Sequence, residues 1–298
     1  FRSEHAVSVS GPHWTSRLGF ILAAAGSAIG LGNIWKFPYI TGKNGGGAFV
    51  LVYLTCVFLV GLPIMLAEFL IGRHSQRDAV GSFAVLSGKN SPWCLVGWGA
   101  VAASFILLSF YSVVVGWSVA YLWHSLTGGF AGQSAEAINL LFGQLVSTPG
   151  RVIFWQGLFM ACTLGIVLGG VRGGIERWSK LLMPLLFFLL LLLCLRGLFS
   201  PGAREALEFM FRPDFQKLTP AALLDALGHA FFTLSIGAGV MITYGSYLER
   251  DADLFGLSLR IALLDTLVAL LAGLAIFPVV FAAGLGSVAR HWLLVQTL

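Results

Sequence analysis

Two glycine-rich runs interrupt apolar stretches of the chain and indicate that its backbone takes part in binding. The first run is Gly26-Ser27-Ala28-Ile29-Gly30-Leu31-Gly32-Asn33, and the second is Ser235-Ile236-Gly237-Ala238-Gly239. A glycine inside a helix costs about 1 kcal/mol relative to alanine, so each run favours a helix break. A helix that breaks within a membrane frees carbonyl and amide groups, which must then face protein, water or a ligand.

Asp265 adds a carboxylate to this chemistry. It lies deep in another apolar stretch, where an ionisable side chain indicates function by default. Carboxylate, amide and carbonyl oxygens are the ligands that hard cations bind. Two explanations that involve no ligand stay open at this point. The glycines can simply allow close helix packing, and Asp265 can face a pore or an interface without holding an ion.

The elements that would position these residues are membrane helices. Of the 298 residues, 57% are hydrophobic and 10% are charged, whereas soluble domains carry about 25% charged residues. A bilayer-spanning helix needs about 20 apolar residues. About seven stretches have membrane length: 16–41, 46–71, 93–126, 152–169, 178–199, 221–248 and 255–285. Helices are the only open-chain structures that satisfy their backbone in lipid, so the sequence predicts an all-α integral membrane protein.

The positive charges between the stretches predict the orientation of the chain. Cytoplasmic loops carry an excess of Lys and Arg. The loops after the second and fourth stretches are basic, with Arg73, Arg77, Lys89, Arg172, Arg177 and Lys180. The loop at 127–150, on the opposite side, has neither Lys nor Arg. We therefore expect a cytoplasmic N-terminus in the cytoplasmic (inner) membrane, and we assign the net charge of +5 to topology rather than to nucleic-acid binding.

Several motifs resemble those of the neurotransmitter:sodium symporter family. They are Trp14-Thr15-Ser16-Arg17-Leu18-Gly19, Gly30-Leu31-Gly32-Asn33-Ile34-Trp35-Lys36-Phe37-Pro38-Tyr39, Asn44-Gly45-Gly46-Gly47-Ala48-Phe49, Phe231-Phe232-Thr233-Leu234-Ser235 and Thr243-Tyr244-Gly245-Ser246-Tyr247. The resemblance runs from about residue 13 to about residue 284. It implies a secondary active transporter rather than an enzyme. It also implies the inverted-repeat fold of the leucine-transporter type, in which helices 1 and 6 are broken.

The resemblance further implies that the fold is unfinished. The family fold has twelve helices, of which the first five are related to helices six to ten by an inverted repeat. We treat 1–298 as a single membrane domain with a first repeat at about 14–199 and part of a second at about 221–285. The tail at 286–298 matches nothing in the family. We expect a chain truncated after about helix seven, with about seven of twelve helices present, and inactive by itself.

Two sodium sites follow from the resemblance. The ligands of the first are a carbonyl oxygen, side-chain oxygens and the substrate carboxylate, and the residues are Ala28, Asn33, Thr233 and Asp265. Ion and substrate then balance each other's charge, so each binds better when the other is present. The second site is a half site with the carbonyls of Gly26 and Ile29, because its other ligands lie in helix eight. Sodium ions are the coupling ions, and no organic cofactor is implied.

The resemblance also implies a site for an α-amino acid. The groups expected to hold its carboxylate are the Leu31 and Gly32 amides, at the positive end of a half-helix, and the Tyr111 hydroxyl. The residues expected around its ammonium group are Ala28, Phe232, Thr233 and Ser235. The residues expected around its side chain are Leu107, Phe232 and Ala238. Because Ala238 stands where the leucine transporter has a bulky aromatic residue, we expect a large hydrophobic or aromatic amino acid.

Two further expectations concern ions and gates. Asp265 stands where many relatives have Asn, and its charge replaces the anion that chloride-dependent relatives need, so we expect chloride independence. Ala269, one turn later, offers no hydroxyl to chloride. Trp14 and Tyr247 are expected at the inner gate and Lys36 at the outer one, where Lys loses the bidentate geometry of the usual Arg.

Alternatives to transport remain. A non-transporting amino-acid sensor on the same fold would bind the same ligands, and a membrane enzyme built on Glu68, His229 and Asp265 is much less favoured, because nothing spaces these residues as a catalytic set. The expected partners are the amino-acid substrate and the lipid bilayer, and a homodimer stays open.

Overall fold

The computed structural model of the chain describes Trp14 and residues 16–282, so the tail at 286–298, which was expected to match nothing in the family, lies outside the described residues. All regular structure in the described part is helical. Five continuous segments are long and apolar enough to cross a membrane: Gly47–Ser75, Cys94–Leu126, Pro149–Leu168, Gly170–Leu198 and Leu254–Ala282. They correspond to five of the predicted stretches, and the other two stretches are the ones with glycine-rich runs.

The first interrupted span is bent by 50° at its glycine-rich run. Its first half, α1 (Arg17–Ala28), begins after Ser16, whose hydroxyl caps the first turn. Its second half consists of a π-helical turn, η1 (Gly32–Lys36), and α2 (Phe37–Lys43). Ile29, between the halves, is extended, with φ −79° and ψ 116°. An extended residue cannot continue an α-helix, so the predicted break is present.

The second interrupted span consists of α11 (Pro220–Thr233) and α12 (Val240–Gly245), with 14 and 6 residues. Neither piece reaches the ~20 residues that a bilayer demands. Between them, Ser235, Gly237 and Gly239 have φ angles of 53°, 83° and 70°. Glycine adopts this left-handed conformation freely, whereas serine does so only where the surrounding structure holds it. The second predicted break is therefore also present.

The other elements complete a bundle around these two spans. In chain order they are α3 (Gly47–Cys56), η2 (Val57–Gly61), α4 (Leu62–Ser75), α5 (Ala79–Ser87), α6 (Cys94–Leu126), α7 (Ala135–Ser147), α8 (Pro149–Leu168), η3 (Gly170–Glu176), α9 (Arg177–Leu198), α10 (Ala203–Phe211), η4 (Phe215–Lys217) and α13 (Leu254–Ala282). The segments α3, η2 and α4 form one span, and η3 with α9 forms another. The short helices α5, α7 and α10 lie between spans.

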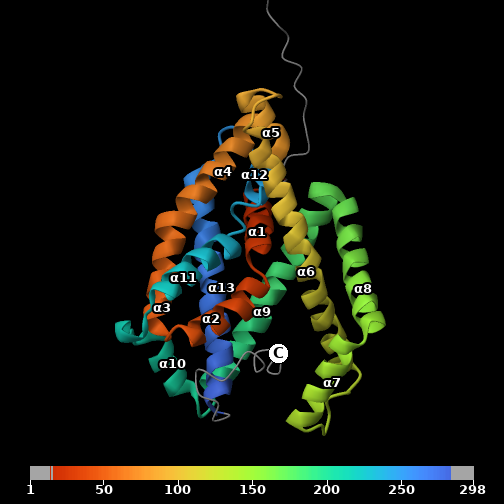
Figure 1. Ribbon diagram of the computed structural model, residues 1–298, viewed down its shortest axis with the longest axis vertical. Coiled ribbons are helices and arrows are strands. Elements are labelled where there is room, and N and C mark those ends of the chain that lie inside the picture. Colours follow the sequence, from red (N-terminus) through yellow and green to blue (C-terminus); the bar gives the residue numbers. More distant parts are fainter. Residues whose placement is uncertain (1–13, 15, 283–298) are drawn as a thin grey trace, which may run out of the picture.

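The interrupted spans lie in the best-packed part of the protein. In Figure 1, α1 lies in the middle of the bundle, and it packs against α13 and α9. α12 packs against α4, and α11 packs against α3. Aromatic side chains fill the core between these helices, including the buried Phe20, Phe37, Tyr53 and Phe69. By contrast, α8 has no buried residue and packs on α6, η3 and α7 at the edge of the bundle.

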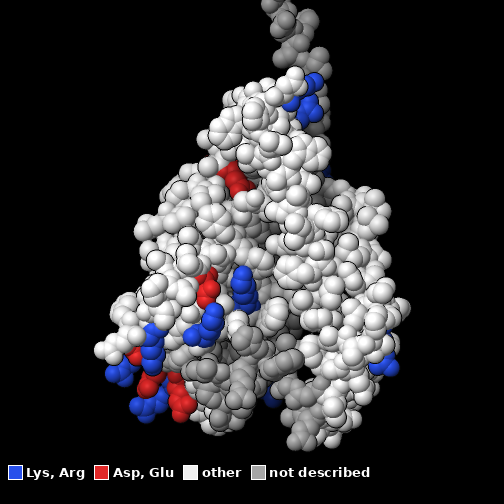
Figure 2. All heavy atoms as spheres, viewed as in Figure 1, with Lys and Arg blue, Asp and Glu red and all other residues white. Residues whose placement is uncertain are grey.

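The surface of the bundle suits a membrane. Charged side chains are sparse on the face drawn in Figure 2 and gather mainly at its lower left, near α10. Large apolar side chains are exposed along α6, α8 and α9, with Phe105 73%, Phe154 62% and Phe188 58% exposed. A soluble protein rarely exposes apolar patches of this extent. Together with the spans, this surface identifies a multi-pass membrane protein.

Candidate functional site

The centre of the site is a cluster of three polar side chains from three different elements. Asn33 of η1, Thr233 at the end of α11 and Asp265 of α13 are all buried, and Asp265 is 0% exposed. The Asn33 Nδ2 atom donates to Asp265 Oδ1 at 2.7 Å and to its backbone oxygen at 3.0 Å. The Thr233 hydroxyl donates to both Asp265 carboxylate oxygens, at 2.9 and 3.1 Å. Residues more than 200 positions apart thus meet at one carboxylate.

The charge of Asp265 has no basic partner. In the part of the chain that the structure describes, Asp265 forms no salt bridge, and its neighbours are neutral donors. Tyr53 of α3 is a third neutral donor, and its hydroxyl lies 3.4 Å from Asp265 Oδ2. An uncompensated buried charge is costly, and a bound cation would neutralise it. The described residues hold no group of three His, Cys, Asp or Glu, so the donor set is one carboxylate among neutral oxygens. This set fits a monovalent hard cation better than a transition metal.

The break in the first span supplies backbone groups beside this cluster. The Ile29 amide is the last to donate in the α-helical pattern, to the Ala25 carbonyl at 2.6 Å. The Gly30 amide donates instead to Asn33 Oδ1 at 3.1 Å, which leaves the Gly26 carbonyl without its usual helical donor. The Ala28 carbonyl lies at the end of α1, where helical carbonyls have no partner within the helix. The predicted carbonyl ligands therefore lie where the helical pattern ends.

A direct hydrogen bond joins the two breaks. The Ser235 hydroxyl, in the break between α11 and α12, donates to the Ser27 carbonyl of α1 at 2.9 Å. The left-handed conformation of Ser235 places its side chain to make this bond. Glu68 of α4 supports the same break, because its Oε1 atom accepts a hydrogen bond from the Gly237 amide at 2.6 Å. Glu68 thus bonds a backbone amide of the second break.

The predicted substrate residues come from the two breaks and from α6. The Tyr111 hydroxyl accepts a hydrogen bond from the Leu31 amide at 3.0 Å. Along about two turns, α6 carries Ser104, Leu107 and Tyr111 on one face, since residues three and four apart share a face. At the other end of this face, the Ser104 hydroxyl donates to the Ala238 carbonyl at 2.9 Å. Tyr111 thus sits at one of the amides predicted for the substrate carboxylate.

Phe232 lies close both to the first break and to Lys36. A Cβ atom on Gly32 would lie 3.0 Å from the Phe232 ring, so the glycine permits the ring to pack closely on the first break. Lys36 Nζ lies 4.4 Å from the centre of the same ring, a cation–π geometry. Lys36 was predicted at the outer gate. An ion pair in this region joins Lys43 to Asp225, with 3.1 Å between Lys43 Nζ and Asp225 Oδ2.

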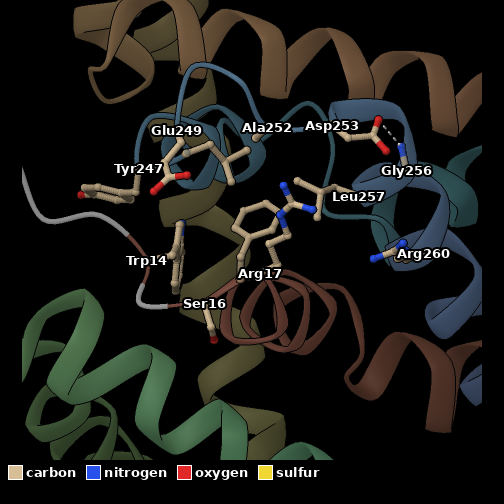
Figure 3. A pocket seen from close by; sticks show the side chains of 12 residues that line it. Trp14, Ser16, Arg17, Tyr247, Glu249, Ala252, Asp253, Gly256, Leu257 and Arg260 are labelled. Carbon is tan, nitrogen blue, oxygen red and sulfur yellow. Dashed lines mark hydrogen bonds between the residues drawn. The ribbon is translucent and has the colours of Figure 1, made fainter.

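The other predicted gate residues lie together at the opposite end. The Trp14 Nε1 atom donates to the Tyr244 carbonyl at 3.4 Å, and the Trp14 ring meets the Tyr247 ring edge to face at 6.3 Å between centroids. Figure 3 shows Trp14 and Tyr247 at one side of a cavity of about 280 Å³. These contacts tie the chain before α1 to the segment that follows α12.

Sequence reasoning missed Tyr53 and Ser104 as parts of the site. Both are polar side chains in apolar spans, and a buried tyrosine hydroxyl usually has a partner. That rule gives a reason to expect a partner for Tyr53, but it does not identify Asp265. The contact between Ser104 and Ala238 depends on how α6 lies against the second break, which no local pattern encodes.

The chain is similar to transporters along almost its whole length. The model of the "Sodium:neurotransmitter symporter family" matches residues 11–140 and 135–289. The chain is 46% identical over 271 residues to the "Uncharacterized sodium-dependent transporter YhdH" of Bacillus subtilis, over 91% of this chain and 60% of the relative. It is 30% identical over 295 residues to the "Inactive sodium-dependent neutral amino acid transporter B(0)AT3" of Homo sapiens, over 90% of this chain and 46% of the relative.

A solved structure has the same arrangement of helices. The crystal structure of MhsT in complex with L-phenylalanine superposes with a TM-score of 0.89 at 50% sequence identity. The match covers 96% of this chain and 65% of that chain. The chain therefore spans less than two thirds of the length of these relatives.

Proposed function

Because the chain belongs to the sodium:neurotransmitter symporter family, we propose that it acts in the sodium-coupled symport of an α-amino acid across the cytoplasmic membrane. The observation that carries the proposal is the buried Asp265 carboxylate. It has no basic partner among the described residues and meets Asn33 and Thr233 where two interrupted spans come together. The relatives are transporters and not enzymes.

Coupling would arise from charge balance at this junction. Asp265 supplies one negative charge, and the substrate carboxylate beside the Leu31 and Gly32 amides supplies a second. Sodium supplies the positive charge that both need in a poorly hydrated cavity. Tyr111, whose hydroxyl accepts from the Leu31 amide at 3.0 Å, would turn to donate to the incoming carboxylate. The affinity for each ligand then depends on the other, as linkage requires.

The substrate is proposed to be a large hydrophobic or aromatic amino acid. Leu107 and Phe232 are proposed as the apolar walls of the site, and the small Ala238 as the position that leaves space for the side chain. The complex of MhsT with L-phenylalanine supports this class. In competition binding, tryptophan, phenylalanine and leucine should displace a labelled amino acid better than glycine or alanine. The opposite order would reject this substrate class.

Binding should need sodium and not chloride. All four predicted ligands of the first sodium site lie within the described chain, so binding can be measured without transport. Sodium at about 100 times its Kd would stabilise the protein by about 2.7 kcal/mol, which raises its melting temperature by about 5 °C or more. We expect this shift, and with it the sodium-dependent part of phenylalanine binding, to disappear when N-methyl-D-glucamine replaces sodium.

The anion provides the second half of this experiment. Because Asp265 supplies the negative charge and Ala269 is a buried alanine one turn away, replacing chloride by gluconate should leave the sodium-dependent shift unchanged. A shift that vanishes in gluconate would contradict chloride independence while leaving sodium coupling intact.

Transport is proposed to need more of the fold than these 298 residues. The second sodium site has only the Gly26 and Ile29 carbonyls here. The test is uptake into proteoliposomes by the chain alone and by the chain fused to the part of the Bacillus relative beyond its matched region. Sodium-driven uptake is expected of the fusion only. Binding without any uptake by the fusion would favour the sensor instead. A cytoplasmic N-terminus and a homodimer remain predictions.

A further inference from the structure

A cavity lies away from the central site, at the end of the bundle where α1 begins. It has a volume of about 280 Å³ and is formed by the beginning of α1, the segment after α12 and the beginning of α13 (Figure 3). Ligand cavities usually measure about 300–1,000 Å³, so this one suits a single small molecule. None of the predicted ligands of sodium or of the central substrate lines it.

The cavity carries an equal number of positive and negative side chains. Arg17 and Arg260 are the bases, and Glu249 and Asp253 are the acids. Within the described residues, none of the four forms a salt bridge. Asp253 is engaged in capping α13, because its Oδ1 atom accepts from the Gly256 amide at 3.0 Å. Glu249 is therefore the acid that remains for a ligand, and Figure 3 shows Glu249 and Arg17 both directed into the cavity.

This charge pattern selects a dipolar ligand. A simple anion attracted by Arg17 would be repelled by Glu249, and a simple cation attracted by Glu249 would be repelled by Arg17. A zwitterion satisfies both, since a guanidinium pairs well with a carboxylate and a carboxylate with an ammonium group. The remaining wall is apolar and aromatic, with the buried Phe20 and Leu257 beside Trp14. One positive side chain, one negative side chain and an aromatic wall therefore match the carboxylate, the ammonium group and the side chain of a free amino acid.

We propose that this cavity is a second amino-acid site, open to the side of the membrane that carries the N-terminus. The ligand carboxylate binds Arg17, its ammonium group binds Glu249, and its side chain lies against Trp14. A bound amino acid links α1 to the segment after α12, which Trp14 already contacts through the Tyr244 carbonyl. Accumulated amino acid on that side would thus hold these two elements together. The site needs no sodium, so it stands apart from the proposed symport site.

The experiment is amino-acid binding to the purified chain by calorimetry in sodium-free buffer, with L-leucine and L-phenylalanine as probes. We expect sodium-independent binding that weakens at least tenfold in Arg17→Gln and in Glu249→Gln. Arg17→Lys should lose less affinity than Arg17→Gln, because lysine keeps the positive charge but lacks the two parallel N–H donors of the guanidinium group. Leucine methyl ester and N-acetyl-leucine, which each lack one charge, should bind at least tenfold more weakly than leucine.

Matched controls come from the same segment of the chain. Arg250 and Asp251 are exposed, adjoin Glu249 and do not line the cavity. Arg250→Gln and Asp251→Asn should therefore bind leucine like the unmodified chain, with the same melting temperature as Glu249→Gln. Asp265→Ala should also retain this binding, which separates the second site from the central one.

Three results would overturn the proposal. The first is no sodium-independent binding by a chain that still responds to sodium. The second is an equal loss of binding in the control variants. The third is binding that arises only when residues 1–12 are removed, which would mean that the cavity receives the chain's own N-terminal segment.

Discussion

Replacing Asp265 by alanine should lower the apparent sodium affinity about 100-fold or more. The carboxylate is fully buried and is the acceptor for the Asn33 amide and the Thr233 hydroxyl. Its removal takes away the negative charge that a cation would neutralise and leaves these donors without their acceptor. Removing one partner of a buried charged interaction costs about 3–5 kcal/mol, and each 1.4 kcal/mol is a tenfold change in affinity.

The measurement is the sodium concentration that gives half of the thermal stabilisation, compared within each variant so that altered basal stability cancels. Asp265→Asn keeps the size but not the charge and should show a smaller loss, together with a new response to chloride. Thr266→Val is the matched control, because Thr266 is the buried neighbour whose hydroxyl has no partner within the described residues. A sodium response in Asp265→Ala equal to that of Thr266→Val would remove Asp265 from the sodium site.

Gly72→Ala should destabilise the protein by about 3 kcal/mol, at the upper end of ordinary overpacking costs. A Cβ atom at Gly72 would collide with the Ile242 carbonyl oxygen and lie 2.9 Å from the Ser246 amide nitrogen. Both atoms belong to the backbone of α12 and the segment after it, so no side chain can rotate away. α4 and α12 would have to separate, and the second break would shift with them.

The control is the same substitution at a helical glycine with space around it. A Cβ atom on Gly157 of α8 would meet nothing within 4 Å, so Gly157→Ala should be neutral or stabilising by up to about 1 kcal/mol. The two variants are compared by thermal unfolding, where we expect a fall of several degrees for Gly72→Ala only. Similar melting temperatures for both would show that the contact between α4 and α12 yields easily.

The fold could be predicted from the sequence to the extent that local composition determines it. Apolar length set the five continuous spans, and the glycines around Ile29 and Gly237 set the two breaks, because conformational cost is a local property. The motifs identified the family, and the family match and the neighbour of known structure confirmed the membership and the all-α transporter fold. The short helices α5, α7 and α10 were missed because they are shorter than a membrane span.

The candidate site was predictable only in part. The motifs placed Asn33, Thr233 and Asp265 in one site, and the structure brings these three side chains together. The partners that depend on how spans cross were not predictable. Tyr53 reaches Asp265 from α3, and Ser235 bonds the Ser27 carbonyl only because the two breaks lie side by side. Such contacts join residues more than 200 positions apart, where neither periodicity nor spacing carries information.

The edge position of α8 has a consequence for what holds the protein together. Since no residue of α8 is buried and its neighbours in the described part of the chain are α6, η3 and α7, we propose that annular lipid acyl chains cover its outer surface. The free energy that docks α8 is therefore a property of the bilayer as much as of the chain. Regions with few buried contacts open first, so amide protons of α8 should exchange with deuterium before those of α13, and lipid composition should set the difference.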